Sequence, residues 1–205
     1  MHFARRWSWK KLGVKVHKTA TVGKNSTFLG LNTVGAFAHL NGDIEIGLGT
    51  SIGRACILHG SIKFGRYTQL GPNVGLFSRN HSINGLTPYQ GPALFEKELK
   101  KNLSNRPIIV GHSTWIGRGA TILSGVKIGN HVIVGAGSVV TSDLPDFSVA
   151  VGNPARIKKY KYTEKLRAAI TESKWWEKDP GFLEAYKEDF LGDIALKTNI
   201  LGKEI

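Results

Sequence analysis

Hydrophobic residues return at every sixth position along much of this chain. Eleven such positions follow one another in a first block, and six more follow in a second block after an interruption. We call them ladder positions: Val16, Val22, Phe28, Val34, Leu40, Ile46, Ile52, Leu58, Phe64, Leu70 and Leu76, then Val110, Ile116, Ile122, Ile128, Val134 and Val140. With 41% of residues hydrophobic, seventeen matches in a row would arise by chance at a level on the order of 10⁻⁷. The pattern therefore indicates a structural repeat.

A second position in each hexad supports the repeat. The residue four places after a ladder position is usually small or β-branched, as at Ala38, Thr50, Cys56 and Thr114, and Asn32 is the main exception. Gly directly follows the ladder residue in ten of the seventeen steps. Because Gly tolerates backbone angles that a side chain would oppose, the hexads predict short flat strands joined by sharp corners.

Three hexads close one triangular coil, so residues eighteen apart should stack at the ~4.8 Å spacing of paired strands. The predicted fold is all-β, a left-handed parallel β-helix of hexapeptide repeats over residues 16–153 with an excursion loop at 82–107. Residues 1–15 form a basic and aromatic N-terminal cap, and residues 154–205 hold a basic exit and a short helical segment. Thr163 is expected to cap a helix that runs through Trp176.

A second helix is expected to open at Asp179 and Pro180 and to carry an apolar stripe. The stripe should pack against the prism or a neighbouring subunit. It consists of Phe182, Leu183, Tyr186 and Phe190.

The net charge of +13 predicts an anionic partner. The single cysteine, Cys56, excludes an internal disulfide and falls on a small inward position, which favours packing over reactivity. No apolar run approaches the length of a bilayer span, and no signal-peptide block is evident, so a cytoplasmic location is expected.

The N-terminal stretch mixes Arg5, Arg6, Lys10 and Lys11 with tryptophans and other apolar residues. One interpretation is a cap over the open first coil. The other is peripheral contact with an anionic membrane, at its inner face. The cap is favoured.

The histidines argue against a metal site. His17, His39 and His59 are not at metal-ligand spacings, and corner or outward positions suit them. A γ-type carbonic anhydrase uses the same prism but needs a His-x-x-x-x-His pair, and no two histidines here are five apart. His81 is different, because it stands in the run FSRNHSI where the ladder breaks and Ser82 replaces an aliphatic residue. A long excursion in a compact domain is commonly functional.

Several motifs carry a family resemblance. The Val/Ile-Gly hexads, the NH before a long loop, the resumption with TWIG, the stretch VGAGSVVTSDLP and the exit VGNPARIKK resemble hexapeptide-repeat acyltransferases that use acetyl-CoA. The loop, the histidine and the KWW at 174–176 are similar to xenobiotic (streptogramin and chloramphenicol) acetyltransferases and to polysaccharide O-acetyltransferases. The resemblance covers about residues 16–176.

The resemblance implies a homotrimer with three active sites between adjacent prisms, and acetyl-CoA as acyl donor without a metal. By position, His81 matches the catalytic base. The residues that match the donor site are Trp115 and Gly117 near the thioester groove, Ala136, Ser138 and Thr141 in the coil that lines CoA, and Arg156, Lys158 and Lys159 near its 3′-phospho-ADP end. One departure is His112, in an outward turn where Asn or Asp is expected.

The chemistry of acyl transfer agrees with a histidine at this place. A thioester is already activated, so what is missing is a base that takes the proton from an acceptor hydroxyl, and neutral imidazole suits this near pH 7. Stacking by eighteens predicts that Lys63 and Glu45 share an outward column with His81, beside Asn80. A neighbouring cation would favour the neutral imidazole, although Glu45 and Lys63 could equally be a solvated ion pair.

The sequence thus predicts an O-acetyltransferase that moves acetyl from acetyl-CoA to a hydroxyl of a sugar or polysaccharide precursor by direct attack. The alternatives are an antibiotic-type acetyltransferase and a non-catalytic β-helical binding module. Nucleic acid is not an expected partner, because no recognised motif is present and the basic residues cluster at the two ends. Sequence does not decide between a glycan and an antibiotic as acceptor.

Overall fold

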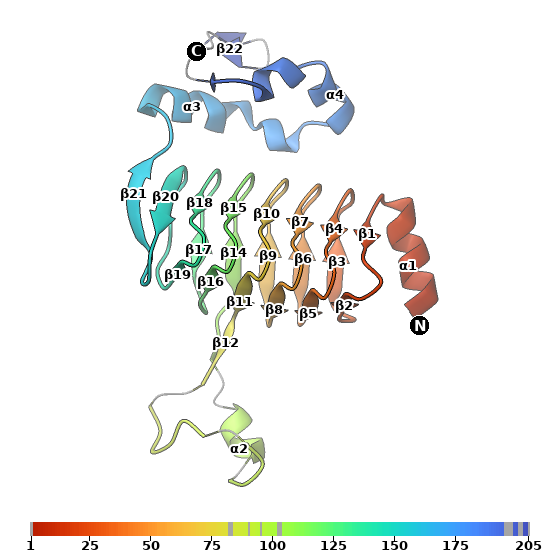
Figure 1. Cartoon of the computed structure of the whole chain (residues 1–205), viewed down its shortest axis with the longest axis vertical. Coiled ribbons are helices and arrows are strands. Elements are labelled where there is room, and N and C mark those ends of the chain that lie inside the picture. Colours follow the sequence, from red (N-terminus) through yellow and green to blue (C-terminus); the bar gives the residue numbers. More distant parts are fainter. Residues whose placement is uncertain are drawn as a thin grey trace.

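The computed structural model describes residues 2–81, 84–89, 91–94, 96–101, 104–194, 199–200 and 203–204. Most of the chain is a three-sided parallel β-solenoid of about 7 turns (Figure 1), as expected for a left-handed β-helix. The fold class predicted from the six-residue period is therefore confirmed.

The three faces of the prism are three sheets of very short strands. Sheet A consists of β1 (Lys15–Val16), β4 (Thr33–Val34), β7 (Ser51–Ile52), β10 (Gln69–Leu70), β15 (Trp115–Ile116), β18 (Ile133–Val134), β20 (Ser148–Val151) and β21 (Arg156–Tyr160). Sheet B consists of β2 (Thr21–Val22), β5 (His39–Asn41), β8 (Ile57–His59), β11 (Gly75–Phe77), β16 (Thr121–Ile122) and β19 (Val139–Val140). Sheet C consists of β3 (Ser26–Phe28), β6 (Ile44–Ile46), β9 (Ile62–Phe64), β14 (Ile108–Val110) and β17 (Lys127–Ile128).

The register between coils follows the predicted step of eighteen. Val16 pairs with Val34, and Val34 pairs with Ile52. After the excursion Leu70 pairs directly with Ile116, so the ladder resumes without a shift in phase. The ladder residues line the prism axis and are buried from Phe28 onward, whereas Val16 and Val22 at the open end are partly buried.

The small inward positions hold the corners together by hydrogen bonds from side chains to carbonyl oxygens. Asn32, the exception in the sequence pattern, is fully buried, and its Nδ2 donates to the carbonyl oxygens of Gly47 at 2.6 Å and Thr50 at 3.1 Å. The hydroxyls of three threonines do the same with one glycine each: Thr50 with Gly65, Thr68 with Gly111 and Thr114 with Gly129. Asn32 therefore fills the same role as these threonines.

The N-terminal end of the prism is covered by α1 (His2–Lys11). The Trp9 ring lies edge-on against Phe28, with centroids 5.1 Å apart. This packing supports the cap interpretation of the N-terminal stretch. The far end is closed by the antiparallel pair of β20 and β21.

The excursion begins earlier than the sequence pattern predicts. Strand β12 (Arg79–Asn80) pairs antiparallel with β13 (Ser104–Asn105), and the Arg106 N–H donates to the Ser78 carbonyl at 3.1 Å. The chain therefore leaves the prism at Ser78, because this pairing lifts it off before ladder position 82, and Ser82 itself lies outside the described residues. The excursion carries α2 (Glu96–Lys101) and projects from the side of the prism opposite the C-terminal helices (Figure 1).

The C-terminal segment begins with α3 (Glu164–Ser173), whose first turn is capped by the Thr163 Oγ1 as predicted. This helix is shorter than expected, because Lys174 adopts a left-handed φ of 43° and η1 (Trp175–Glu177) follows. Asp179 caps α4 (Pro180–Glu184). The rest of the segment is η2 (Lys187–Phe190), β22 (Asn199–Ile200) and β23 (Lys203–Glu204).

The prediction of one long second helix was wrong. Tyr186, with φ of −114° and ψ of 20°, separates α4 from η2. Phe182 and Phe190 remain 44% and 46% exposed, and the Phe182 ring contacts Tyr186 rather than the prism. Phe190 lies beyond the break and packs edge-on against Trp175, with ring centroids 5.0 Å apart.

Candidate functional site

His81 lies directly after β12, where the paired strands carry it away from the prism, and it is exposed to solvent. Its Nδ1 is 2.7 Å from the carbonyl oxygen of Pro88. Since a carbonyl oxygen can only accept, Nδ1 carries the hydrogen and Nε2 of the neutral ring keeps its lone pair. The His81 N–H also donates to Asn80 Oδ1 at 3.1 Å. The Pro88 carbonyl thus orients the ring, and none of the described hydrogen bonds involves its Nε2.

The expected column of Glu45, Lys63 and His81 does not form. Lys63 pairs in register with Ile109, not with His81, because the hairpin diverts the chain before the next turn of sheet C. Lys63 and Glu45 do form an ion pair, at 3.1 Å, but their side chains are 62% and 42% exposed to solvent. A pair of this kind contributes little to stability. It is a surface pair on sheet C.

The residues predicted to line the thioester groove lie on and beside sheet A. Trp115 is 51% exposed on β15, between Gln69 and Ile133 of the neighbouring strands. The turn after β15 passes close to the next coil, since a Cβ on Gly117 would lie 2.6 Å from the Ala136 backbone nitrogen. Gly is therefore required at position 117, and Ala136 is exposed in the turn beside it.

Ser138 differs from its neighbours in the predicted donor site. Its side chain is fully buried, and its Oγ accepts a hydrogen bond from the Gly152 N–H at 3.1 Å. The hydroxyl is therefore committed to the corner of the prism and cannot line a groove. Thr141, three residues later, is exposed just after β19.

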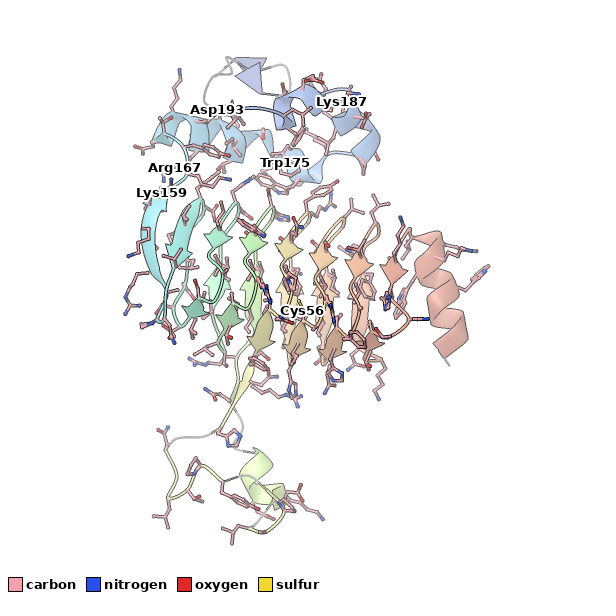
Figure 2. All side chains as sticks on the ribbon, viewed as in Figure 1. Cys56, Lys159, Arg167, Trp175, Lys187 and Asp193 are labelled. Carbon is pink, nitrogen blue, oxygen red and sulfur yellow. The ribbon has the colours of Figure 1, made fainter. Side chains whose placement is uncertain are left out.

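The predicted cationic residues lie together on β21. All five residues of this strand, Arg156 to Tyr160, are exposed, and Arg156, Lys158 and Lys159 are among them (Lys159 in Figure 2). The Ala155 N–H donates to the Val139 carbonyl at 2.8 Å, so the strand begins beside the coil that holds Ala136 and Thr141. The two groups of donor-site residues thus adjoin each other.

One chain does not bring His81 beside Trp115. The chain visits sheets A, B and C in turn, so the corner between sheets B and C is the one opposite sheet A. The hairpin that carries His81 leaves from that corner, after β11, whereas Trp115 lies on sheet A. The predicted base and the predicted thioester groove are on different sides of the same prism.

A cluster of aromatic and imidazole rings lies at the corner between sheets C and A. Residues with left-handed φ stack along this corner: Gly13, Leu31, Gly49, Tyr67, Ser113, His131 and Phe147. The C-terminal segment docks on it through Trp175, which stacks on Tyr67 with centroids 5.4 Å apart, and Trp176, which stacks on His112 at 5.3 Å. Figure 2 shows Trp175 between the C-terminal segment and the prism.

Burial keeps the histidines of this cluster neutral. His131 stacks on Phe147 at 4.9 Å, and burial, aided by the nearby Lys161 charge, lowers its pKa to about 4. Burial and then Arg66 lower the pKa of His112, whose Nδ1 accepts from the Arg66 N–H at 2.9 Å. Desolvation penalises the charged imidazolium in both cases. The KWW motif was noted only for its family resemblance, so neither its docking on the prism nor its histidine partners were predicted.

A half-open cavity of ≈ 180 Å³ adjoins this cluster, between the corner and the C-terminal segment. His131, Tyr162, Trp175 and Phe190 line it together with Lys161. Its mixture of charged and apolar groups does not indicate a particular ligand.

Cys56 is a packing residue. It is fully buried, its Sγ donates to the Gly71 carbonyl at 3.2 Å, and burial raises its pKa. Within the described part of the chain, no three His, Cys, Asp or Glu side chains gather as metal ligands. No helix among the described residues has both the length and the apolar character to cross a bilayer.

The repeat also matches a known sequence family. The model for the bacterial transferase hexapeptide (six repeats) matches residues 107–142. Over these residues the chain is therefore similar to bacterial transferase hexapeptide repeats. Its similarity to acetyltransferases, predicted from the motifs, is confirmed by comparison with known proteins.

Two curated relatives and one solved structure illustrate the similarity of this hexapeptide-repeat chain. A galactoside O-acetyltransferase of Lactococcus lactis is 33% identical over 95 residues, 46% of this chain and 41% of the relative. A chloramphenicol acetyltransferase of Klebsiella aerogenes is 34% identical over 68 residues, 33% of this chain and 32% of the relative. The chain spans about half the length, or less, of the curated relatives it matches.

The solved structure is a mutant of the perosamine N-acetyltransferase from Caulobacter crescentus in complex with CoA and GDP-perosamine. It aligns with a TM-score of 0.57 and 27% identity, over 76% of this chain and 64% of that one.

Proposed function

We propose that this protein transfers an acetyl group from acetyl-CoA to a hydroxyl of a sugar or polysaccharide precursor. The proposal is supported by the hexapeptide repeat and by relatives whose names include a galactoside O-acetyltransferase and a sugar N-acetyltransferase bound to CoA. The observation that carries it is the oriented imidazole of His81, exposed on a hairpin with its basic Nε2 free.

In the proposed reaction His81 is the general base. Its Nε2 takes the proton of the acceptor hydroxyl as that oxygen attacks the acetyl carbonyl carbon, so the ester bond forms in the same step. The carbon–sulfur bond then breaks, and the proton on the imidazolium passes to the departing CoA thiolate. Neutral His81 is restored, and no acyl-enzyme forms. The Pro88 carbonyl keeps the ring oriented and supports the transient imidazolium.

For the donor, we propose a groove along Trp115, Gly117, Ala136 and Thr141. Ser138 would line this groove with its main chain, because its hydroxyl is buried. The exposed strand β21 suits the phosphates of the nucleotide end, because Arg156, Lys158 and Lys159 stand close together there. Charge-assisted hydrogen bonds from such side chains are the usual means of holding phosphate.

The proposed assembly is a homotrimer with one site between each pair of adjacent prisms. It is supported by the separation of His81 from Trp115 within one chain, since a neighbour could supply the missing half of each site. Exposed apolar side chains on the prism, such as Ile57 at 47% and Ile109 at 42%, would also be covered by association.

A thiol-release assay with acetyl-CoA, screened over sugar acceptors, tests the proposal. We expect CoA release that depends on a sugar acceptor, and mass spectrometry of the product distinguishes an acetylated hydroxyl from an acetylated amine. Release with chloramphenicol-type acceptors alone would favour the second candidate, an antibiotic acetyltransferase, to which the Klebsiella aerogenes relative points. Binding of acetyl-CoA without release for any acceptor would indicate a non-catalytic binding module.

A further inference from the structure

The outer face of α1 and the adjoining corner form an exposed surface at the N-terminal end of the prism, which we call the N-terminal face. It comprises Trp7, Lys10, Lys11, Leu12 and Leu31. Trp9 is turned inward against Phe28, whereas Trp7 is 59% exposed. A helix of this pitch places residues two apart on nearly opposite sides. One tryptophan therefore caps the core and the other faces away from it.

Apolar side chains stand together on this face. Leu12 and Leu31 are 45% and 51% exposed. They are neighbours, because the Leu31 N–H donates to the Leu12 carbonyl at 2.8 Å. Among the described residues, neither leucine belongs to the hydrophobic core of the prism. Exposed large apolar groups that adjoin one another mark an interaction surface more often than single ones do.

The first 42 residues are rich in positive charge. Residues 1–42 contain seven Lys and Arg and no Asp or Glu, so they supply more than half of the net charge of +13. The Lys11 Nζ lies 3.7 Å from the centroid of the Trp7 ring. Lys10 and Lys15 are exposed beside it. An exposed indole ring, two exposed leucines and exposed ammonium groups at one end of the prism match the layers of a lipid headgroup region.

We propose that the N-terminal face docks on an anionic lipid membrane surface, with Trp7, Leu12 and Leu31 entering the interface and Lys10 and Lys11 facing the lipid phosphates. A membrane is favoured over nucleic acid because burying the leucines among lipid acyl chains stabilises the bound state, whereas nucleic acid offers no such apolar environment. Since α1 covers the end of the prism, the prism axis would point away from the membrane surface. The excursion and the C-terminal segment, on the sides of the prism, would then not contact the membrane (Figure 1). This inference does not depend on the proposed acetyl transfer.

Flotation of the full chain with vesicles tests the proposal. We expect binding to vesicles of phosphatidylcholine with phosphatidylglycerol, weak binding to phosphatidylcholine alone, and release as ionic strength rises. Replacing Lys10 and Lys11 with Glu (K10E/K11E) should weaken binding at least about 30-fold, because each lost cation costs about fivefold and the new carboxylates are repelled by the lipid. The control K165E/K178E makes the same change in charge at exposed positions of the C-terminal segment and should bind nearly as wild type.

The apolar part of the proposal has its own variant. Trp7→Ala should weaken vesicle binding several-fold at constant charge without changing the melting temperature, because the side chain is exposed. Phe182→Ala, which removes a 44% exposed ring from the C-terminal segment, is the matched control and should bind as wild type.

The proposal is overturned if wild-type protein does not float with anionic vesicles at low salt, or if the two lysine pairs have equal effects. It is also overturned if Trp7→Ala binds vesicles as wild type while duplex DNA binds with the same lysine dependence, since the surface would then be a general polyanion site.

Discussion

Across seven residues of the excursion, the Nδ1 of His81 lies 2.7 Å from the carbonyl oxygen of Pro88. This hydrogen bond selects one tautomer of the neutral ring, because a carbonyl oxygen cannot donate. It also ties the orientation of His81 to the conformation of the excursion rather than to the prism. The expected partner, Lys63, has no such role, since it is stacked with Ile109.

Removing the imidazole should abolish most of the proposed activity. His81→Ala is expected to lower kcat by roughly 10²-fold to 10⁴-fold, the usual range for the loss of a general base. The KM for acetyl-CoA and the melting temperature should change little, because His81 is exposed and its proposed role is to take a proton from the acceptor rather than to hold the donor. The control is His39→Ala, which removes an exposed histidine from β5. Full activity in the His81→Ala protein would exclude the assignment.

Removing the cations of β21 should weaken donor binding. Changing Arg156, Lys158 and Lys159 to Ala is expected to raise the KM for acetyl-CoA and to leave kcat at saturating donor unchanged, because phosphates distant from the thioester are bound equally in ground and transition states. The double variant of Lys165 and Lys178 to Ala tests for a general effect of net charge. If KM and its salt dependence both stay the same in the triple variant, the nucleotide binds elsewhere.

Trimer formation can be tested by mass and by complementation. Light scattering should give about 67 kDa, three times the 22.4 kDa of one chain. Each of two variants, His81→Ala and the triple β21 variant, should be poorly active by itself at low acetyl-CoA concentration. Co-expression should restore part of the activity, because some interfaces of a mixed trimer would pair an intact His81 with an intact β21. A mass of one chain at micromolar concentration, or no complementation in a stable trimer, would contradict sites built between chains.

Asn32 should be important for stability despite its mismatch with the repeat. Asn32→Ala is expected to lower the free energy of unfolding by roughly 2–5 kcal/mol, because it leaves the buried Gly30 N–H and the carbonyls of Gly47 and Thr50 without this partner. Urea titration of the variant beside Thr33→Ala, at the exposed neighbouring position, provides the measurement. Equal stabilities of the two variants would show that these bonds contribute little.

The buried His131 should make stability depend on pH. Its native pKa of about 4 lies below the unfolded value near 6.5, so between these values the unfolded chain binds the additional proton. Stability is therefore present above about pH 6.5 and is lost as the pH falls toward 4, by up to about 3 kcal/mol from this group. His112, whose pKa is also lowered, adds in the same direction.

His131→Asn isolates this contribution to the pH dependence, because Asn tolerates the left-handed φ of 57° but does not titrate. The free energy of unfolding, measured between pH 4 and 7, should have a smaller slope in the variant than in wild type. An unchanged slope would mean that His131 is not buried as a neutral ring.

The sequence by itself determined the repeating part of the protein. Ladder residues such as Ile46 and Phe64 recur because each coil presents the same slot to the prism axis, so size and polarity at one position repeat eighteen residues later. The helix starts at Thr163 and Asp179 could also be predicted, since a capping side chain accepts a hydrogen bond from a backbone N–H in the first turn of its own helix. In each case the deciding contact lies within the period or within a few residues.

Only the tertiary structure decided the features that occur once. The pairing of Arg79 with Asn105 takes the chain off the prism, so extrapolating the period placed His81 beside Lys63 when Ile109 occupies that position. The stacking of His112 on Trp176 joins rings far apart in the chain that no repeat relates. A period predicts contacts that every coil makes, whereas a single antiparallel pairing or ring stack depends on where two unrelated segments meet in space.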